Sequence, residues 1–444
     1  MNFNESGKES DPAAQYFRDS NSCHDPLATH NQDVASNSKT TAMSVLTFSF
    51  ILTSFLILVP TMSSARPPAR DSTPPASITT TVMPIRLVAQ TPVVSASLNH
   101  RKSGAFFFDS GAVNSITPET ARQLGLKVEW GFSGLGMGNS RLRVGKTQIS
   151  SIQIGGLTLR NQTFSVVALP YAATHGVQPG IIGTLGYELL KTLAVEIDYD
   201  HKTLSLTDGR SFRYTGHGVA VPFFLRGTQP VVEGMIDGIP GTFQIDTGSD
   251  ASLSLFAPFV QRNALTHRLE PHLQGFAGEG LGGPETAYFV RSQTLSIGGI
   301  QVHHVVTELL EDTNGIGAEA EDAGNIGTGT LKQFNLTFDY PHHTLYFDKN
   351  ANFGRPDVFN RSGLAIQIKA EGIVIANVFK DSPAEEAGIS AGDTITAIDG
   401  WMGDQITAER LFDILWQRPG TDVRLTVIHQ GSTREVCIKL RDIL

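Results

Sequence analysis

Residues 241–250 read "GTFQIDTGSD", which places the carboxylate of Asp246 at the end of an apolar run, followed by Thr247 and Gly248. A charged group at the end of a buried strand costs free energy unless it is paired or used. One such tripeptide also occurs by chance in a fair share of chains of 444 residues. The stretch therefore gains meaning only from the rest of the chain.

A second copy of this stretch lies earlier in the sequence. "GAFFFDSGAVNSIT" at 104–117 aligns with "GTFQIDTGSDASLS" at 241–254, so Asp109 corresponds to Asp246 at an offset of 246 − 109 = 137 residues. Three further pairs follow in the same order: "GFSGLGMG" from Gly131 with "GFAGEGLGG" from Gly275, "SIQIGGLTL" from Ser151 with "TLSIGGIQV" from Thr294, and "GIIGTLGYELL" from Gly180 with "GNIGTGTLKQF" from Gly324. This ordered self-similarity predicts two similar lobes.

The composition favours β-structure and excludes one class of partner. A chain of 444 residues exceeds what one hydrophobic core usually serves, which predicts roughly three domains. Only 17% of the residues are charged while 44 are glycine, a profile of strands and tight turns. The net charge of −9, without a basic block, argues against binding to nucleic acid.

Local signals support small β-barrels with a short helix in each lobe. Asp237-Gly238 between apolar runs predicts a β-hairpin. After the first aspartate, "TPETARQLGL" predicts a helix with Thr117 as its N-cap, Pro118 at its first position and Gly125 at its end. Pairing two such lobes around an axis would bring the two aspartates together.

These residues resemble the aspartic peptidases, with a retropepsin-like form of each lobe, over roughly residues 82–348. The resemblance rests on one repeated pair of motifs: Asp109-Ser110-Gly111-Ala112 and Asp246-Thr247-Gly248-Ser249, each after an apolar run, and Ile181-Ile182-Gly183 and Asn325-Ile326-Gly327 downstream. Asn325 departs from the family pattern, which has an apolar residue there. Neither aspartate is missing, whereas a degenerate, inactive relative would more often have lost one.

The resemblance implies that Asp109 and Asp246 are catalytic. Two adjacent carboxylates cannot both ionise, so the pair shares one proton, and it can activate water on one side while polarising a carbonyl on the other. The family pattern gives supporting roles to Ser110, Gly111, Thr247, Gly248 and Ser249, and we expect the Ser249 hydroxyl to add a hydrogen bond to Asp246. It gives a substrate contact to Asp250, which is equally well explained as a solvated loop carboxylate. The glycine-rich stretches 131–138 and 275–283 are candidate flaps over a substrate, with Gly134 and Gly136 in the first, although plain turns would have the same sequence pattern.

No cofactor or metal is expected. His303-His304 and His342-His343 are adjacent pairs without the HExxH spacing of a zinc-binding helix, so we interpret them as turn residues.

The segment from Gly363 to Leu440 resembles a PDZ domain of the bacterial kind. Its signature is "SPAEEAGISAGDTITAIDG", followed by an expected helix "TAERLFDILWQR". Such domains take an extended chain end as an added strand. The resemblance places the carboxylate cradle at Gly363, Leu364, Ala365 and Ile366 and the side-chain pocket at Leu411 and Leu415. The partners would be the C-termini of peptides, unless the domain only packs on the peptidase.

An uncharged stretch at residues 43–62, "MSVLTFSFILTSFLILVPTM", is long enough to cross a bilayer as a helix. Small residues before Arg66 fit a signal-peptidase site. A start at Met1 favours a membrane anchor, whereas a start at Met43 favours cleavage and release. Either case predicts an exported protein of the cell envelope, in the periplasm or on the extracytoplasmic face.

The expected fold is mainly β: two retropepsin-like β-barrel lobes form a pseudo-dimer, followed by a PDZ domain. The expected division is a disordered leader at 1–42, a signal peptide or anchor at 43–62, a linker at 63–81, peptidase lobes at 82–212 and 213–348, a linker at 349–361 and the PDZ domain at 362–444. The expected function is an aspartic-type endopeptidase acting on proteins or peptides. Two alternatives stay open, a catalytically silent peptide-binding scaffold and a homodimer in which each lobe pairs with its twin in another chain.

Overall fold

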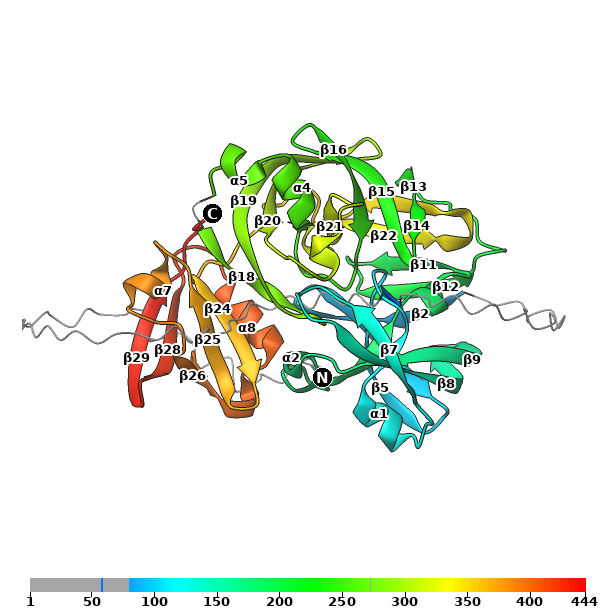
Figure 1. The fold of residues 1–444 in the computed structure, drawn as a ribbon, viewed down its shortest axis with the longest axis horizontal. Helices are drawn as coiled ribbons and strands as arrows, with labels where there is room; N and C mark the ends of the chain where they lie inside the picture. Colours follow the sequence, from blue (N-terminus) through cyan, green and yellow to red (C-terminus); the bar gives the residue numbers. More distant parts are fainter. Residues whose placement is uncertain (1–56, 59–79, 272) are drawn as a thin grey trace, which may run out of the picture.

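The apolar runs before the two aspartates form central strands of two separate sheets (Figure 1). The computed structural model describes residues 57–58, 80–271 and 273–444. The sheet of the first lobe has, in spatial order, β1 (Ile57–Leu58), β7 (Glu129–Leu135), β8 (Leu142–Ile154), β9 (Leu157–Val166), β6 (Ser115–Ile116), β10 (Ile181–Leu185), β5 (Lys102–Phe108), β4 (Thr91–Leu98) and β3 (Arg86–Val88). Three consecutive buried phenylalanines, 106–108, anchor β5 in the core.

The second lobe repeats this arrangement strand by strand. Its sheet runs β18 (Leu273–Gly280), β19 (Gly283–Ile297), β20 (Ile300–Leu310), β17 (Leu253–Leu255), β21 (Gly324–Ile326), β16 (Ile239–Ile245), β15 (Gln229–Ile236) and β14 (Phe224–Arg226). Each of these strands has a counterpart at the same place in the sheet of the first lobe, where β1 is the one additional described strand. The repeat in the sequence is therefore a repeat of the fold.

A third sheet joins the two lobes. Its order is β13 (Val219–Pro222), β23 (Thr344–Lys349), β22 (Phe334–Asp339), β11 (Leu193–Asp198), β12 (Thr203–Asp208) and β2 (Thr81–Pro84). The two halves meet where β11 pairs antiparallel with β22, with Ala194 opposite Asp339 and Ile197 opposite Leu336. One hydrophobic core runs through both lobes. The pseudo-twofold pairing is therefore made within a single chain.

The turn and helix signals of the sequence are confirmed. Asp237 and Gly238 both have positive φ, 49° and 78°, which suits the tight turn between β15 and β16. Helix α1 (Pro118–Gln123) begins after Thr117, whose hydroxyl accepts a hydrogen bond from the Thr120 amide. The other short helices of the lobes are α2 (Tyr171–His175), α3 (Tyr187–Leu190), α4 (Ala257–Arg262), α5 (Leu265–Arg268), α6 (Thr328–Leu331), η2 (Ile316–Ala318) and η3 (Tyr340–His342).

The C-terminal domain packs beside the second lobe (Figure 1). It comprises β24 (Leu364–Lys369), β25 (Gly372–Val378), α7 (Pro383–Glu386), β26 (Thr394–Ile398), β27 (Trp401–Met402), η4 (Gly403–Gln405), α8 (Ala408–Leu415), β28 (Asp422–His429) and β29 (Ser432–Lys439). Phe379 and Ala365 of this domain share a buried cluster with Phe276 and Phe289 of the second lobe. The contact is thus apolar and continuous with the core of β18 and β19.

The hydrophobic stretch 43–62 lies outside the described residues except for Ile57–Leu58. These two residues form β1, which pairs with Leu135 and Gly134 of β7, so the expected helix does not hold at this point. Within the described ranges, no helix is long and apolar enough to span a bilayer.

Candidate active site

The structure brings the two repeated aspartates together at the seam between the lobes. Asp109 follows β5 and Asp246 follows β16, and both side chains are fully buried. Each backbone amide donates to the neighbouring parallel strand, to Leu185 O and to Ile326 O, at 3.0 Å in both lobes. A side-chain hydrogen bond joins the two carboxyl groups. The repeat therefore delivers two matching acids to one point.

The residues after the aspartates tie the lobes to each other. The Ser110 amide donates to Thr247 Oγ1 at 2.9 Å, and the Thr247 amide donates to Ser110 Oγ at 3.0 Å. Each hydroxyl then donates across the seam to a strand carbonyl, Ser110 to Ile245 O and Thr247 to Phe108 O. Because these four buried hydrogen bonds cross from one lobe to the other, they hold the two carboxyl groups at a fixed separation.

The two glycines let the backbone turn back on the acids. The Gly111 amide donates to Asp109 Oδ1 at 2.8 Å, and the Gly248 amide donates to Asp246 Oδ1 at 2.7 Å. A Cβ at position 248 would lie 2.2 Å from the carboxyl carbon of Asp109. Only glycine fits at this point of close approach.

The electrostatics of the pair favour one retained proton. Burial raises the pKa of Asp246 to about 6, against the opposing effect of hydrogen bonds from Asp109, from the Gly248 amide, from Asn325 and from the Ser249 amide. A carboxyl group with that pKa is protonated in mildly acidic solution. The pair can then act as acid and base together.

Asn325 makes the two halves of the site unequal. Its Nδ2 donates to Asp246 Oδ2 at 3.0 Å, whereas Ile181 occupies the corresponding place in the first lobe. The expected bond from the Ser249 hydroxyl is not formed: Ser249 Oγ is buried without a hydrogen-bond partner, because the turn aims its amide at Asp246 instead. The sequence marks Asn325 as a departure from the family pattern, but not as a donor to the dyad.

Tyr340 is a site residue that the sequence analysis missed. Its side chain is buried, and burial raises the pKa of its phenol, with further contributions from the charges of Asp109 and Asp246. Among the described residues, its hydroxyl has no hydrogen-bond partner. Tyr199 holds the same place after β11 and is also buried. The repeated "DY" pair at the ends of β11 and β22 was the available signal.

The glycine-rich stretches form two hairpins whose tips meet. Gly134 lies in β7 and Gly136 just after it, and the Gly136 carbonyl accepts from the Ile316 amide. The tips are joined by two backbone hydrogen bonds: the Gly282 amide donates to Met137 O at 2.7 Å, and the Ser140 amide donates to Gly282 O at 2.8 Å. Each lobe thus contributes one hairpin, and the two tips contact each other; these hairpins are the candidate flaps and are called flaps below.

A polar latch reinforces this closure. Asn139 Nδ2 donates to Asp312 Oδ1 at 2.9 Å, and Asn139 Oδ1 accepts from the amides of Thr313 and Asn314. Burial raises the pKa of Asp312 to about 6, opposed by the bond from Asn139. The latch connects the first flap to the segment after β20 in the other lobe.

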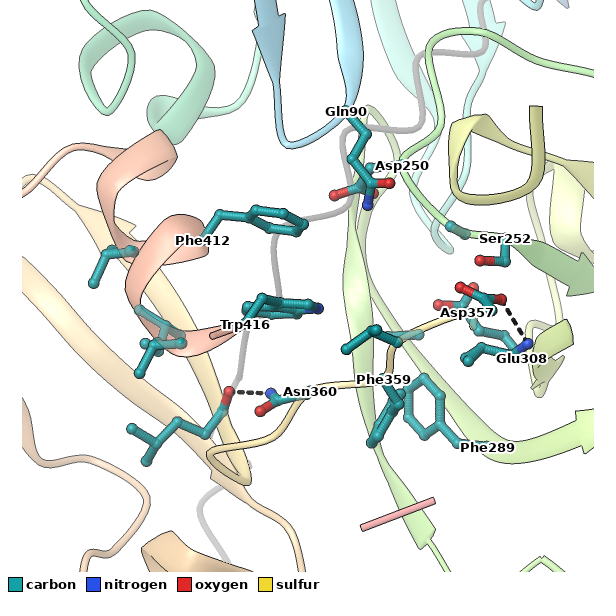
Figure 2. Close-up of a pocket in the computed structure, with 18 of the residues that line it drawn as sticks. Gln90, Asp250, Ser252, Phe289, Glu308, Asp357, Phe359, Asn360, Phe412 and Trp416 are labelled. Atoms are coloured by element: carbon teal, nitrogen blue, oxygen red, sulfur yellow. Dashed lines mark hydrogen bonds between the residues drawn. The ribbon is translucent and has the colours of Figure 1, made fainter. Parts of the chain in front are cut away.

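Asp250 lines a cavity between the second lobe and the PDZ domain (Figure 2). Burial and the charges of Glu308 and Asp246 raise its pKa well above the usual range for an aspartate. Leu364, Ile366, Leu411 and Leu415 line the same cavity from the PDZ side.

Gly363 and Ala365 do not line this cavity. Gly363 has φ of 80° and abuts Ser382, and Ala365 is buried in the cluster shared with the second lobe.

The histidine pairs take structural places. His342 bonds through Nδ1 to Asp339, and His303 contacts Thr294. Across residues 80–271 and 273–444, no group of three or more His, Cys, Asp or Glu side chains is arranged to hold a metal ion.

Comparison with known families divides the chain as its fold does. Residues 94–189 and 232–329 match the family described as aspartyl protease, and residues 348–440 match the PDZ domain family. The two aspartyl protease segments contain Asp109 and Asp246.

Relatives of known name are similar over short stretches only. The chain is 34% identical over 77 residues to a probable CtpA-like serine protease of Staphylococcus haemolyticus and 36% identical over 75 residues to a probable periplasmic serine endoprotease DegP-like of Halomonas elongata. Each match covers 17% of this chain, and the chain spans 16% and 15% of these relatives. Among solved structures, an aspartic proteinase from Irpex lacteus matches with a TM-score of 0.41 and 11% identity over 63% of this chain and 100% of that one.

The family matches and the repeated sheets describe the same division of the chain. The chain therefore carries two aspartyl protease family segments, which form its two lobes, followed by a PDZ domain.

Proposed function

We propose that the chain is an aspartic-type endopeptidase in which Asp109 and Asp246 activate one water molecule. The observation that carries the proposal is the hydrogen-bonded, fully buried carboxyl pair, with one pKa raised to about 6. Burying two neighbouring carboxyl groups has a cost in free energy, and a shared proton offsets it. That arrangement suits acid–base chemistry better than a structural role.

The reaction follows from the protonation of the pair. The ionised carboxylate takes a proton from water as the oxygen adds to the scissile carbonyl carbon, while the protonated carboxyl donates its proton to the carbonyl oxygen. A tetrahedral diol results. The proton then held by the first acid passes to the amide nitrogen, a diol hydroxyl returns its proton to the other acid, and the C–N bond breaks to give an acid and an amine.

The Ser110 and Thr247 hydrogen bonds support this proposal because they fix the separation of the two acids. Positioning of this kind is a large part of catalysis. The flaps would open to admit the substrate and then close to exclude bulk water from it. Asp250, Gly134 and Gly136 remain candidates for substrate contact.

The names of the curated relatives do not bear on the catalytic type. Their matches extend over 77 and 75 residues, whereas Asp109 and Asp246 lie 246 − 109 = 137 residues apart. Neither match can include both acids. The aspartic type therefore rests on the site itself.

We further propose an exported protein of the cell envelope, anchored or released through residues 43–62, whose PDZ domain binds protein substrates or partners. The uncharged stretch supports export. The name of the Halomonas relative includes the word periplasmic, which agrees with this proposal.

Digestion of a peptide library tests the catalytic class. The purified chain is expected to cleave internal peptide bonds, to be blocked by a statine-containing peptide that mimics the tetrahedral diol, and to be unaffected by a serine-directed fluorophosphonate. Loss of cleavage with the fluorophosphonate would exclude the aspartic type. Absence of any cleavage would instead favour the alternative function, a catalytically silent peptide-binding scaffold.

A further inference from the structure

The peptide groove of the PDZ domain lies between strand β24 and helix α8. Its cavity is lined by apolar side chains of both elements, namely Leu364, Ile366, Leu411 and Leu415. Ile368 lies on the same face of β24 as Ile366, two residues further on, and Ala408 lies one turn before Leu411 on the same face of α8. These two residues mark the far end of the groove, away from the loop at Gly363.

The first lobe covers this far end. The carbonyl of Gly176, directly after helix α2, accepts a hydrogen bond from the Ala408 amide at 2.9 Å. This amide begins helix α8, so it has no acceptor within the helix. A Cβ at Gly176 would lie 2.9 Å from Ile368 Cδ1, and Val177 is buried in one apolar cluster with Ile368. An extended peptide on β24 would therefore collide with residues 171–178, called the cover below.

An ion pair holds the cover to the PDZ helix. Arg86 Nη1 of β3 donates to Glu409 Oε1 of α8 at 3.1 Å, and the same nitrogen donates to the Gln178 carbonyl at the end of the cover. The two charged side chains are 37% and 23% exposed, so solvent and salt screen their attraction less than that of a surface pair. Reversing one of the two charges should therefore loosen the cover.

The chain also occupies the other end of the groove. Asn360 Oδ1 accepts from the Ser362 amide at 3.0 Å and from the Gly363 amide at 2.9 Å. The Leu364 amide donates to Ser362 Oγ at 3.1 Å. These amides belong to the loop that the PDZ resemblance assigns to a ligand's terminal carboxylate. Both ends of the groove are thus engaged by the chain itself.

The cavity between the two ends has a volume of about 100 Å³. A cavity of roughly 150 Å³ holds benzene, so this space suits one side chain and not an extended peptide. Its opposite side is a buried wall of second-lobe residues that includes Asp250 and Glu308 (Figure 2). A peptide of several residues therefore needs the cover to move.

We infer that the PDZ domain is held closed by its own chain: the cover occupies one end of the groove, and the C-terminus of another polypeptide binds only by displacing it. The inference rests on the proposed binding role of the PDZ domain and goes beyond it, since it names the contact that a ligand must break. It does not depend on the catalytic proposal.

The test measures binding of a peptide to the full chain carrying Asp109→Asn, which keeps the probe from being cleaved. The probe is a fluorescein-labelled hexapeptide of alanine and valine that ends in leucine with a free carboxylate. A groove that is mostly closed lowers the apparent affinity by the fraction of molecules that are open. Adding Arg86→Glu places two like charges at the ion pair and should tighten binding about tenfold.

Two further variants locate the effect. Arg86→Glu combined with Glu409→Arg restores opposite charges and should bring the affinity back toward that of the parent chain. Arg160→Glu, at an exposed arginine of β9, should leave the affinity unchanged. A melting curve for each variant establishes that it is folded.

Hydrogen exchange reports on the cover directly. Saturating peptide should speed exchange across residues 171–178 and at the Ala408 amide, which loses its acceptor. Equal affinity of the parent and the Arg86→Glu chain, no binding of the probe to any of the chains, or binding that leaves exchange at 171–178 unchanged would overturn the inference. Peptide-library cleavage by the wild-type chain tests the catalytic proposal separately.

Discussion

Asn325 is the residue that sets the two halves of the dyad apart. Its Nδ2 stabilises the ionised form of Asp246 and so lowers the pKa of that carboxyl group, although burial keeps it near 6. The first lobe has Ile181 at this place and no such donor. The asymmetry suggests that the acidity of the pair is tuned from the second lobe.

Asn325→Leu should therefore move the alkaline limb of activity. Without the donor, the pKa of Asp246 rises, the pair keeps its shared proton to higher pH, and the limb of kcat/KM that falls near pH 6 should shift upward by about one unit. The pH profile of peptide hydrolysis measures this shift. A limb that stays in place, or moves to lower pH, would show that Asn325 does not govern the dyad.

Gly248→Ala should abolish most of the peptidase activity, because the added methyl group collides with a catalytic carboxyl group. The added methyl group would lie 2.2 Å from the Asp109 carboxyl carbon, so one of the acids must move. A misplacement of this kind is expected to lower kcat/KM at least about a hundredfold. Gly156→Ala is the matched control, since its nearest contact is a side-chain oxygen at 3.2 Å. Equal activity of the two variants would contradict the geometry of the pair.

At the scale of single residues, the sequence predicts the acids and the residues that directly follow them, but not the contacts made from elsewhere in the chain. Asp109 and Asp246 follow from a repeat that local patterning makes visible. The bond from Asn325 and the place of Tyr340 depend on how strands far apart in sequence pack beneath the dyad. The filling of the PDZ loop by Asn360 likewise depends on a loop conformation that composition does not encode.

In the proposed function, the two flaps are the elements that control access to the dyad. Their tips are joined by backbone hydrogen bonds from Gly282 to Met137 and from Ser140 to Gly282, and Asn139 adds a latch to the segment 312–314. The second flap also packs on the PDZ domain, since Phe276 of β18 shares a cluster with Phe379. A ligand in the PDZ groove would therefore lie next to elements that contact the second flap.

Asn139→Ala should loosen the closed flaps. The variant loses one donated and three accepted hydrogen bonds, so hydrogen exchange at residues 129–145 and 273–283 should become faster. We expect kcat/KM to fall about fivefold to tenfold, because closure orders the substrate. Ser140→Ala retains the backbone hydrogen bond from residue 140 to Gly282 O and serves as control. Unchanged exchange in the Asn139 variant would refute the latch.

The elements themselves were largely predictable. The hairpin at 237–238 and the helix after Thr117 rest on turn and capping chemistry, which is local. The pairing of β11 with β22 joins residues that lie far apart in the sequence, from Ile197 opposite Leu336 (336 − 197 = 139) to Ala194 opposite Asp339 (339 − 194 = 145). No local pattern specifies such a pairing.

At the scale of the whole molecule, several buried acids make stability depend on pH. Burial raises the pKa of Glu279 and Glu319 to about 7, of Glu308 to about 8 and of Asp246 and Asp312 to about 6. A carboxyl group whose pKa is higher in the folded state binds its proton more tightly there. Its contribution to stability is complete below the unfolded pKa and is lost as pH rises through the folded value.

The melting temperature should accordingly fall as the pH rises from about 5 to about 8. Glu308→Gln should flatten this dependence, since a neutral amide does not ionise in the buried wall. Thermal unfolding followed by circular dichroism measures both. A melting temperature that rises over this range, or an identical dependence in the variant, would show that these acids are ionised without cost in the folded chain.

The division into two related lobes and a PDZ domain is the part of the account that the sequence predicted best. It follows from ordered repeats and from a distinctive C-terminal signature, and the family matches agree with it. The docking of the PDZ groove against acids of the second lobe was not predictable, because Glu308 and Leu411 meet only through tertiary packing.

The most direct test of the central claim is kcat/KM for one internally cleaved peptide, measured for the wild-type chain, Asp109→Asn and Asp246→Asn. Both substitutions should lower it at least about a thousandfold while the chain stays folded, since a single acid cannot serve as base and acid together. Asp404→Asn, at an exposed aspartate of the PDZ domain, should leave it unchanged. Wild-type rates in either dyad variant would contradict the account.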